Sequence, residues 1–461
     1  MTHQRCEDGS LGRRTAGFTH SAKTAGVIAL LVLSCGDGAV GPPRPPVATT
    51  VTVNPGSASF TALGETARFT AEVRDQNGEV MAGAVVVWAS SDASVATVDG
   101  SGLVTAAGNG TATITATAGS AAGTASVIVF SEPEIYNGNL FVLPVDENLA
   151  TGEWSLLDGT RQFYEHFDDD FDFLVFVVNL YPGDDPSGRS YFTSTRNDVR
   201  GIGHPISSDN RWPAALQGVV VHGIVSFSVD RRSIIHTGPM LHELMHKWAN
   251  FVTPSSGSGP HWGFSSANGT LGGFDISDLA DHGGGRYSAG DFSTHGVAAN
   301  NKPYSPLELY LAGFLPPEEV PDLWVAEDGQ WVDEASGNQM FTASRVRTYS
   351  IEDIVGMQGL RVPDHTQSQR EFRAATILLV DDHHPITSRN LNQLSDDISW
   401  FSRTAGDGDD RVYNFFEATG GRAMIDMNDL SRSASQRANV PPSCTSNDTP
   451  PWAPGFVWRK H

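Results

Sequence analysis

His242 and His246 lie four positions apart, and Glu243 directly follows the first of them. On a helix this spacing places both imidazoles on one face, one turn apart, so that both rings can reach the same metal ion. A carboxylate beside such a pair is placed to take a proton from a metal-bound water. The spacing therefore predicts a zinc site with its own catalytic base.

The flanking residues predict the helix that must carry this site. Pro239 suits the first helical position, and Thr237 precedes it as a candidate cap. Pro254 is expected to end the helix. Apolar residues follow one buried face at helical spacing: Leu241, Leu244, Met245, Trp248 and Val252. His242 and His246 then lie on a different face, as expected of residues that line a cleft.

The pattern His-Glu-x-x-His resembles the signature of the zincin metallopeptidases, and the predicted helix supports the resemblance. It implies a zinc-dependent hydrolase of peptide bonds, with His242 and His246 as zinc ligands and Glu243 as the general base. It implies a reaction class and not a subfamily. The sequence departs from the metzincin pattern, because Trp248-Ala249-Asn250 follows the second histidine where that group has a glycine and, soon after, its third histidine.

A catalytic zinc normally has three protein ligands and one open position. The third ligand that we expect is His261, which lies in a glycine-rich loop beyond the predicted helix. Glu308 is an alternative, although a capping box at the start of its own predicted helix gives it a structural role. Asp275 or Asp278 would make an aspartate variant of the site.

Two further groups of polar residues are candidates for chemistry. Four residues can supply a donor that stabilises an oxyanion opposite the metal, although each is expected to be structural: Tyr287, Tyr304, His282 and His295. Two acidic runs, Asp168-Asp169-Asp170-x-Asp172 and Asp407-Gly408-Asp409-Asp410, have the oxygen density that calcium (Ca2+) requires. Neither run matches the EF-hand ligand pattern, so we expect solvated turns and a single zinc ion (Zn2+) as the cofactor.

Composition limits the partners and the compartment. The chain has 461 residues, with 30 basic against 53 acidic side chains and a formal net charge of −23. Such a surface argues against a nucleic acid as partner. No apolar run reaches the roughly 18 residues that a membrane-spanning helix needs. We expect a protein or peptide substrate, and contact with a membrane only through a lipid anchor.

The N-terminal residues predict export. An apolar run over residues 25–33 follows Arg13, Arg14 and Lys23, as in a signal peptide. Val32-Leu33-Ser34-Cys35 resembles a bacterial lipobox, which implies that residues 1–35 are a lipoprotein-type signal peptide and that Cys35 carries the anchor. The alternative is a plain cleaved signal peptide. We expect an outer-membrane or surface lipoprotein, otherwise a secreted protein. The three cysteines do not make a disulfide framework.

A Gly/Pro-rich linker, residues 36–49, precedes a segment of short β-runs at residues 50–130. The candidate strands are 51–53, 67–73, 85–88, 112–117 and 125–129. Val85-Val86-Val87-Trp88-Ala89-Ser90-Ser91 and Gly102-Leu103-Val104-Thr105-Ala106 resemble the group 2 bacterial immunoglobulin-like domains. The resemblance implies an all-β sandwich that serves as a spacer or adhesive module on exported proteins, with Trp88 in its core.

Residues 131–430 are predicted to form a second folded unit, followed by a polar tail at residues 431–461. Apolar runs at 173–179 and 219–227 predict buried strands, and the second is a candidate edge strand for an extended substrate. Besides the metal-site helix, helices are expected over 161–167, 306–314 and 388–401. Strands followed by helices favour an α+β domain. The chain as a whole is therefore expected to be multidomain, an all-β sandwich followed by an α+β zincin-like domain.

These observations favour an exported zinc metallopeptidase in which His242, His246 and His261 hold zinc and Glu243 is the base. A different class of function stays open. A non-catalytic surface adhesin or glycan-binding lipoprotein would use the immunoglobulin-like module and carry a degenerate peptidase fold behind it.

Overall fold

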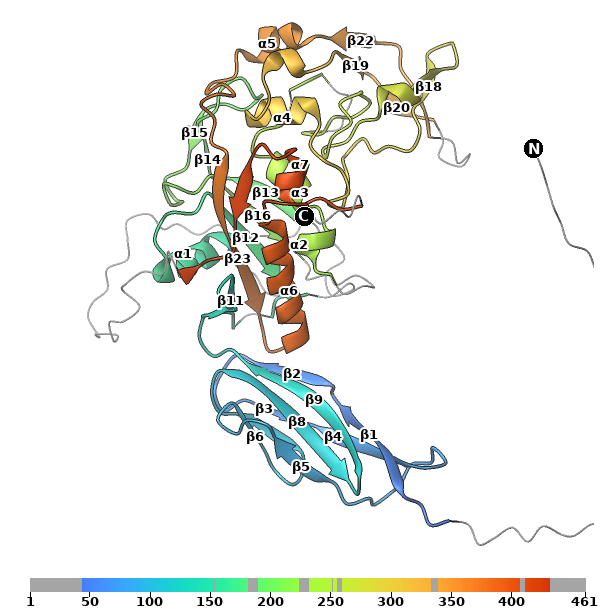
Figure 1. Cartoon of the computed structure of the whole chain (residues 1–461), viewed down its shortest axis with the longest axis vertical. Helices are drawn as coiled ribbons and strands as arrows, with labels where there is room; N and C mark the ends of the chain where they lie inside the picture. The colour runs from blue at the N-terminus through green and yellow to red at the C-terminus, as the bar shows by residue number, and fades with distance from the viewer. Residues whose placement is uncertain are drawn as a thin grey trace, which may run out of the picture. The chain divides into compact units, whose positions relative to one another are not determined.

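The computed structural model describes residues 44–146, 148–151, 154–180, 190–223, 232–250, 252–254, 259–332, 339–406 and 411–431 (Figure 1). The predicted signal peptide with Cys35, the acidic run at 407–410 and the predicted tail lie outside these residues, apart from residue 431. Within the described residues, no helix has both the length and the apolar character needed to cross a membrane.

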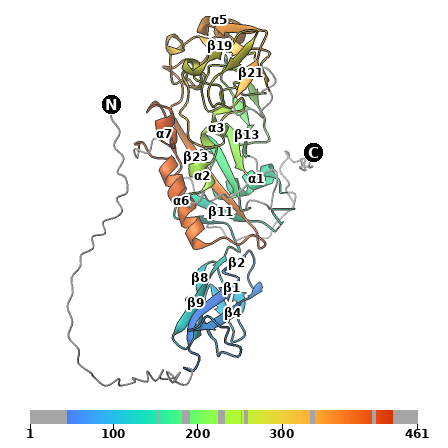
Figure 2. The same cartoon turned by 90° about the vertical axis from the view of Figure 1, so that its right-hand side faces the viewer.

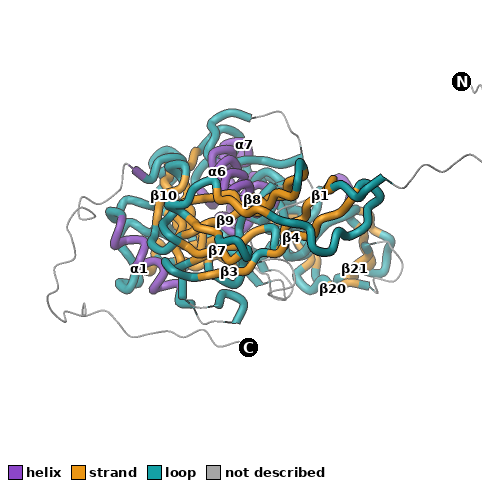
Figure 3. Tube along the Cα trace, turned by 90° about the horizontal axis from the view of Figure 1, so that it is seen from below, coloured by secondary structure: helices purple, strands orange, loops and turns teal. Residues whose placement is uncertain are grey.

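Alternating apolar and polar residues build the strands of the first folded unit. These strands are β1 (Ala48–Asn54), β2 (Ser57–Phe60), β3 (Thr66–Arg68), β4 (Thr70–Asp75), β5 (Val87–Ser90), β6 (Ala96–Val98), β7 (Leu103–Ala106), β8 (Gly110–Ala118) and β9 (Ala121–Val129). They form the sheets β2-β9-β8-β5, β3-β7-β6 and β1-β4. Figure 3 shows β8 beside β9, with which it pairs along its whole length. Every second side chain of β8, such as Ile114, is buried in the core of the unit, so the predicted all-β fold is confirmed.

Two of the predicted strand boundaries in this unit were wrong. The run 67–73 is divided between β3 and β4 at Phe69, whose backbone N–H donates to the carbonyl of Gly102 at 2.8 Å. The division turns the Phe69 ring into the core. The predicted strand 85–88 begins only at Val87, and Val85 is exposed. Trp88 packs against the core, as predicted.

A mixed sheet forms the centre of the second unit. Its strands are β10 (Glu134–Tyr136), β11 (Leu140–Pro144), β12 (Phe173–Val178), β13 (Ser190–Ser194), β16 (Gly218–His222), β23 (Glu371–Val380) and β24 (Met424–Asp426). Their order is β10-β11-β23-β12-β16-β13, and β24 pairs with β23. The four inner strands β11, β23, β12 and β16 are parallel, whereas β10 and β13 run antiparallel to their neighbours.

Shorter elements surround this sheet. The other strands are β14 (Arg196–Asn197), β15 (Ser207–Ser208), β17 (Ala280–Asp281), β18 (Arg286–Ser288), β19 (Leu323–Ala326), β20 (Gln330–Trp331), β21 (Met340–Thr342) and β22 (Val346–Tyr349). The helices are α1 (Leu156–His166), α2 (Ile234–Thr237), α3 (Met240–Met245), α4 (Pro306–Ala312), α5 (Ile351–Gln358), α6 (Ser388–Phe401) and α7 (Phe415–Ala418), with 3-10 turns η1 (Ile276–Asp278) and η2 (Pro317–Glu319).

Helices cover both faces of the central sheet. Val175 and Val177 of β12 share a buried cluster with residues of α3, α4 and α6. Leu174 and Phe176 of the same strand face the other way, into a cluster with Phe163 of α1. Figure 1 shows α6 and α1 on opposite sides of β23 and β12, and Figure 2 shows the two helices on opposite sides of β23. A parallel centre between two helical layers is an α/β arrangement, so the segregated α+β arrangement predicted for this unit was wrong in that respect.

The predicted helices were located better than the predicted edge strand. The prediction for α6 is confirmed at both ends, and α4 begins at the predicted Pro306. Helix α1 begins at Leu156, earlier than expected, because Ser155 caps it. The predicted edge strand 219–227 was wrong: its described part belongs to β16, which has partners on both sides. Among the described strands, β13 is the edge at this side of the sheet.

Candidate metal centre

The helix that carries the histidine pair is much shorter than predicted. Helix α3 ends with His246 as its C-cap, well before Pro254. The N–H groups of Lys247 and Trp248 donate to carbonyls three residues back, at 3.1 and 2.9 Å, which tightens the last turn. The Asn250 side-chain amide also donates to the His246 carbonyl at 2.6 Å and takes the place of a further helical bond.

The helix start also differs from the prediction, although the apolar face is confirmed. Thr237 is not a cap of α3. It closes α2, where its hydroxyl donates to the Ser233 carbonyl at 3.0 Å. Pro239 is the N-cap residue and makes no side-chain cap bond. The predicted stripe is buried throughout: Leu241, Leu244, Met245, Trp248 and Val252. Apolar residues at this spacing indicate which side chains face the core, but they do not indicate where the helix ends.

Buried polar side chains from a later segment hold α3 in place. The Asn300 side chain accepts from the Leu241 N–H at 2.9 Å and donates to the carbonyls of Ile235 and His236 at 2.9 and 3.1 Å. The Tyr304 hydroxyl donates to the Leu241 carbonyl at 3.1 Å. Helices α2 and α3 are thereby fixed relative to each other, which fixes the direction of the histidine side chains.

Three imidazoles converge beside α3. The Nε2 atom of His242 lies 3.3 Å from the Nε2 atom of His246 and 3.3 Å from that of His261. One ligand nitrogen from each ring lies within 4.8 Å of the other two, and among the described His, Cys, Asp and Glu residues this is the one group of three with such spacing. His242 is buried, whereas His246 and His261 are partly exposed, so solvent reaches the cluster.

Each helical histidine is oriented through its other ring nitrogen. The Nδ1 atom of His242 lies 2.9 Å from the Thr270 carbonyl, which can only accept, so Nδ1 carries the proton. The Nδ1 atom of His246 lies 3.0 Å from Oδ1 of Asn250, while the amide of Asn250 faces Nε2 of His204. These contacts leave Nε2 of both rings as the lone-pair atom, which is the state that binds a metal.

Glu308 is placed away from the cluster and has a full set of other partners. Its carboxylate accepts from Trp262 Nε1 at 2.9 Å, Thr270 N at 3.0 Å, Thr270 Oγ1 at 3.2 Å, Leu271 N at 2.9 Å and Ser305 N at 2.9 Å. The capping box with Ser305 is present as predicted. The candidate aspartates are also elsewhere: Asp275 caps η1, and neither Asp275 nor Asp278 joins the histidine group.

Burial sets the protonation of the site. It lowers the pKa of His242 to about 4, against the hydrogen bond to Thr270, and lowers the pKa of His246 to about 3. Both rings are therefore neutral at pH 7, as metal ligands must be. Burial also raises the pKa of the Glu243 carboxyl to about 8. Among the described residues no hydrogen bond or charge offsets this burial, so with no cation beside it the Glu243 carboxyl is mainly protonated at pH 7.

Of the four oxyanion candidates, one lies beside the cluster. The His295 ring is exposed, and its centroid lies 5.6 Å from that of His261. Tyr304 is committed to the Leu241 carbonyl. Tyr287 packs in an aromatic cluster on the small sheet β17-β18-β21-β20, and His282 lies in the connection between β17 and β18, where its ring contacts the Ser288 hydroxyl.

The acidic run at residues 168–172 makes hydrogen bonds to backbone N–H groups and an ion pair. Asp169 accepts from the N–H groups of Ala214 and Ala215, and Asp172 accepts from the N–H of Arg373 at 2.8 Å. Asp170 pairs with the Arg373 guanidinium.

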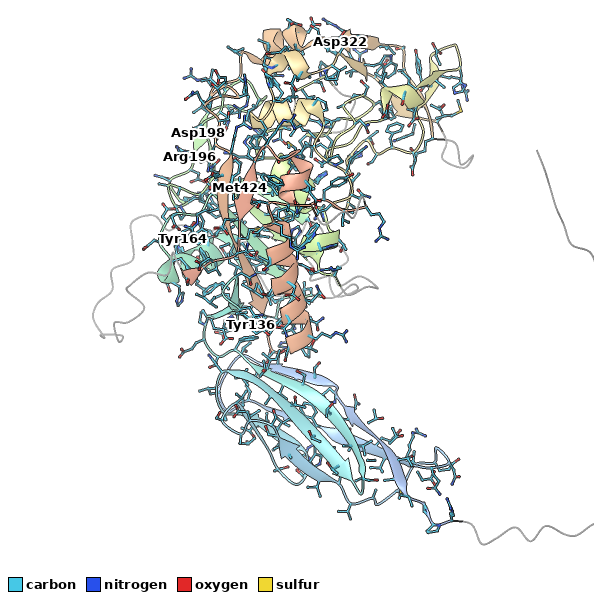
Figure 4. All side chains as sticks on the ribbon, in the orientation of Figure 1. Tyr136, Tyr164, Arg196, Asp198, Asp322 and Met424 are labelled. Atoms are coloured by element: carbon cyan, nitrogen blue, oxygen red, sulfur yellow. The ribbon has the colours of Figure 1, made fainter. Side chains whose placement is uncertain are left out.

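Several residues of the site could not be found from residue type and spacing, as the histidines were. Thr270 acts through its backbone carbonyl, and Gly296 through its lack of a side chain, since a Cβ there would lie 2.5 Å from the His242 ring. Lys247 is buried, and its ammonium donates to the Arg196 carbonyl at 2.6 Å, beside the exposed pair of Arg196 and Asp198 (Figure 4). Asn250 carried a signal in its spacing: it follows His246 by four residues, within reach of its ring.

Comparison with known proteins identifies part of the chain. Residues 47–129 match the bacterial Ig-like domains of group 2, so this segment is a domain of that family. The match includes no residue of the histidine cluster. No curated protein matches the chain.

Among solved structures, domains 5–6 of the S-layer protein SbsC are similar at 23% identity and a TM-score of 0.17, over 23% of this chain and 55% of that chain. The Yersinia pseudotuberculosis adhesin InvE is similar at 22% identity and a TM-score of 0.13, over 18% of this chain and 26% of that chain. A GH10 xylanase from termite gut with a bacterial Ig-like domain is similar at 21% identity and a TM-score of 0.13, over 27% of this chain and 24% of that chain. Likenesses this partial do not indicate an activity.

Proposed function

We propose that residues 131–430 form a zinc-dependent hydrolase of peptide bonds, carried by an exported protein on a bacterial Ig-like spacer. The observation that carries the proposal is the spacing of the three Nε2 atoms. Two nitrogens that bind one zinc ion at about 2.0–2.1 Å in tetrahedral geometry lie about 3.3 Å apart. His242 keeps this separation, 3.3 Å, from both His246 and His261.

The donor set favours zinc and an open coordination position. Imidazole nitrogen suits zinc, copper, iron and nickel, whereas calcium and magnesium prefer oxygen. Three protein ligands are the usual number in a catalytic zinc site, whereas structural sites have four. Glu308 and Asp275 already have other partners, so three histidines without a carboxylate are the ligand set that we propose.

Zinc at this position would lower the pKa of a bound water and polarise the scissile carbonyl. The side chain that transfers the proton is Glu243. Its carboxylate ionises more readily beside a cation, takes a proton from the attacking water and passes that proton to the leaving amine nitrogen. His295 is the side chain that we assign to the oxyanion, because it lies beside His261 and is exposed.

The edge of the sheet supports a polypeptide substrate. Helix α3 packs against β13 and β16, and β13 is paired on one side with β16. Within the described strands its other side has no partner. An extended peptide can add to such an edge through main-chain hydrogen bonds, which bind any sequence and leave selection to the side chains.

Export is proposed on two grounds. The Ig-like domain belongs to a family whose members serve as modules of exported proteins, and the N-terminal residues resemble a lipoprotein signal that ends at Cys35. The Ig-like domain then acts as a spacer between the anchor and the hydrolase.

The proposal is tested on the purified protein by metal analysis and by casein cleavage with and without a zinc chelator. We expect about one zinc ion per chain and cleavage that the chelator abolishes. A protein that takes up no zinc would overturn the proposal and favour a binding module. A zinc-loaded protein that cleaves no peptide would overturn the assignment of the bond.

A further inference from the structure

Glu308 binds a tight turn, and this turn contacts the segments that carry the proposed metal ligands. Gly269 and Gly272 close the turn, with N–H to carbonyl distances of 2.9 and 3.1 Å in the two directions. The N–H groups of the two residues between them, Thr270 and Leu271, both donate to the Glu308 carboxylate, at 3.0 and 2.9 Å. Glu308 is fully buried, so these two hydrogen bonds are shielded from solvent.

The carbonyls of the same turn face the ligands. The Thr270 carbonyl accepts from Nδ1 of His242 at 2.9 Å. The Leu271 carbonyl accepts from the N–H of Trp262, the residue after His261, at 3.0 Å. Trp262 also donates through its indole N–H to Glu308 at 2.9 Å. The Glu308 carboxylate therefore hydrogen-bonds both to Thr270, whose carbonyl accepts from His242, and to Trp262, the residue after His261.

Two glycines show how closely these groups pack. A Cβ on Gly269 would lie 2.3 Å from the Glu308 carboxylate. A Cβ on Gly296 would lie 2.5 Å from the His242 ring, from the side of the segment that includes Val297. The Val297 N–H donates to the same Thr270 carbonyl at 3.0 Å. The His242 ring thus has little freedom to turn about its long axis.

We propose that Glu308 is the positioning residue of this centre. Without touching the ion, it holds His242 and His261 in the geometry that binds a metal before any metal arrives. The inference rests on the proposed function, and it makes the metal affinity of the site depend on a carboxylate that does not itself bind the ion. Ligand orientation fixed in advance raises metal affinity, because binding then loses no side-chain freedom.

The test compares Glu308→Gln with Ser305→Ala for binding of Zn2+ alone, in competition with a chromophoric chelator. Glutamine keeps the size of the side chain but has one acceptor oxygen, so donors of the turn lose their partner. We expect affinity to fall about 10- to 100-fold. Ser305→Ala is the matched control: it removes the cap hydroxyl, 3.4 Å from the Glu308 N–H, and leaves the turn alone. We expect it to lower the melting temperature without weakening zinc binding.

Trp262→Phe keeps the test decisive if Glu308→Gln does not fold. It removes the single indole N–H bond to Glu308 and retains an aromatic ring. We expect zinc affinity to fall about three- to tenfold. The visible absorption of bound Co2+, which reports ligand geometry, should change in this variant and stay unchanged in Ser305→Ala.

The outcomes separate the two proposals. If the native protein binds no zinc, the proposed function fails. If the native protein binds zinc and Glu308→Gln, or Trp262→Phe in its place, binds it with native affinity, the positioning role is overturned and the proposed function stands. Equal losses in Ser305→Ala and Glu308→Gln would also overturn the positioning role, since they would show a general effect of helix stability.

Discussion

The Nε2 atoms of His261 and His242 lie 3.3 Å apart although the two residues are 19 positions apart in the sequence. Helix α3 ends at His246, and the segments that carry the two histidines are linked by hydrogen bonds through a third segment. The Gly269–Gly272 turn contacts both of them, and Glu308 holds that turn. The candidate centre therefore belongs to the tertiary structure and not to the five-residue motif alone.

Replacing Glu243 by Gln should separate metal binding from turnover. Glutamine has a similar size but cannot take a proton from water, so the general base is lost. We expect zinc content equal to that of the native protein and peptidase activity lower by a factor of about 100 to 10,000. Metal analysis and a fluorogenic peptide assay on the same preparation check this. Native turnover in the variant would contradict the role of Glu243.

The third ligand can be assigned by substitution. His261→Ala should weaken zinc binding severely, because a site with two imidazoles has lost a third of its protein ligands. Asp275→Ala is the control, since Asp275 caps η1 and is exposed. We expect it to bind zinc like the native protein. The reverse pattern in a chelator competition would show that the aspartate, and not His261, is the ligand.

Asn250 should contribute to affinity through His246. Its Oδ1 atom accepts from Nδ1 of His246 at 3.0 Å, and its amide donates to the His246 carbonyl at 2.6 Å. Asn250→Ala removes both contacts, so the ring is free to turn. We expect zinc affinity to fall about tenfold or more. Asn250→Asp keeps the acceptor for Nδ1 and should retain most of the affinity. If both variants bind zinc as the native protein does, the contact does not orient the ring.

His222 should make the folded protein sensitive to acid. It is completely buried on β16, and burial lowers its pKa to about 3. The unfolded chain takes up a proton below the ordinary pKa of about 6.5, and the folded chain does not. Stability is therefore full above that value and is lost as pH falls toward 3.

The variant His222→Phe removes this titrating group but keeps a buried ring. Between pH 7 and pH 5, the free energy of unfolding of the native protein should fall by about 2 kcal/mol more than that of the variant. Urea unfolding at the two pH values measures the difference. Equal losses in both proteins would show that His222 does not titrate in this way.

The sequence allowed the periodic parts of the fold to be predicted. Helix α6 matched at both ends because Thr387 caps it and its apolar residues follow one face. The end of α3 was not predictable in this way, because the same buried stripe continues through a tightened turn in which Asn250 captures the His246 carbonyl. The run at 219–227 showed a buried strand but not its neighbours, so its place inside the sheet could not be read from it.

The site was only partly predictable for a related reason. His242 and Glu243 lie on α3 and His246 is its C-cap, so their spacing alone brings them together. Glu308 had two plausible roles, and the choice depends on the turn that its carboxylate meets, which is 37 and 38 positions away. Contacts through backbone carbonyls, such as that of Thr270, depend on no side chain and so leave no trace in residue types.

A crystal structure of the zinc-soaked protein, with anomalous scattering recorded at the zinc edge, tests the central claim most directly. We expect one strong peak about 2.0–2.1 Å from an imidazole nitrogen of each of His242, His246 and His261, with Glu308 still bound to the Gly269–Gly272 turn. A peak elsewhere, or a zinc ion held by Glu308, would contradict it.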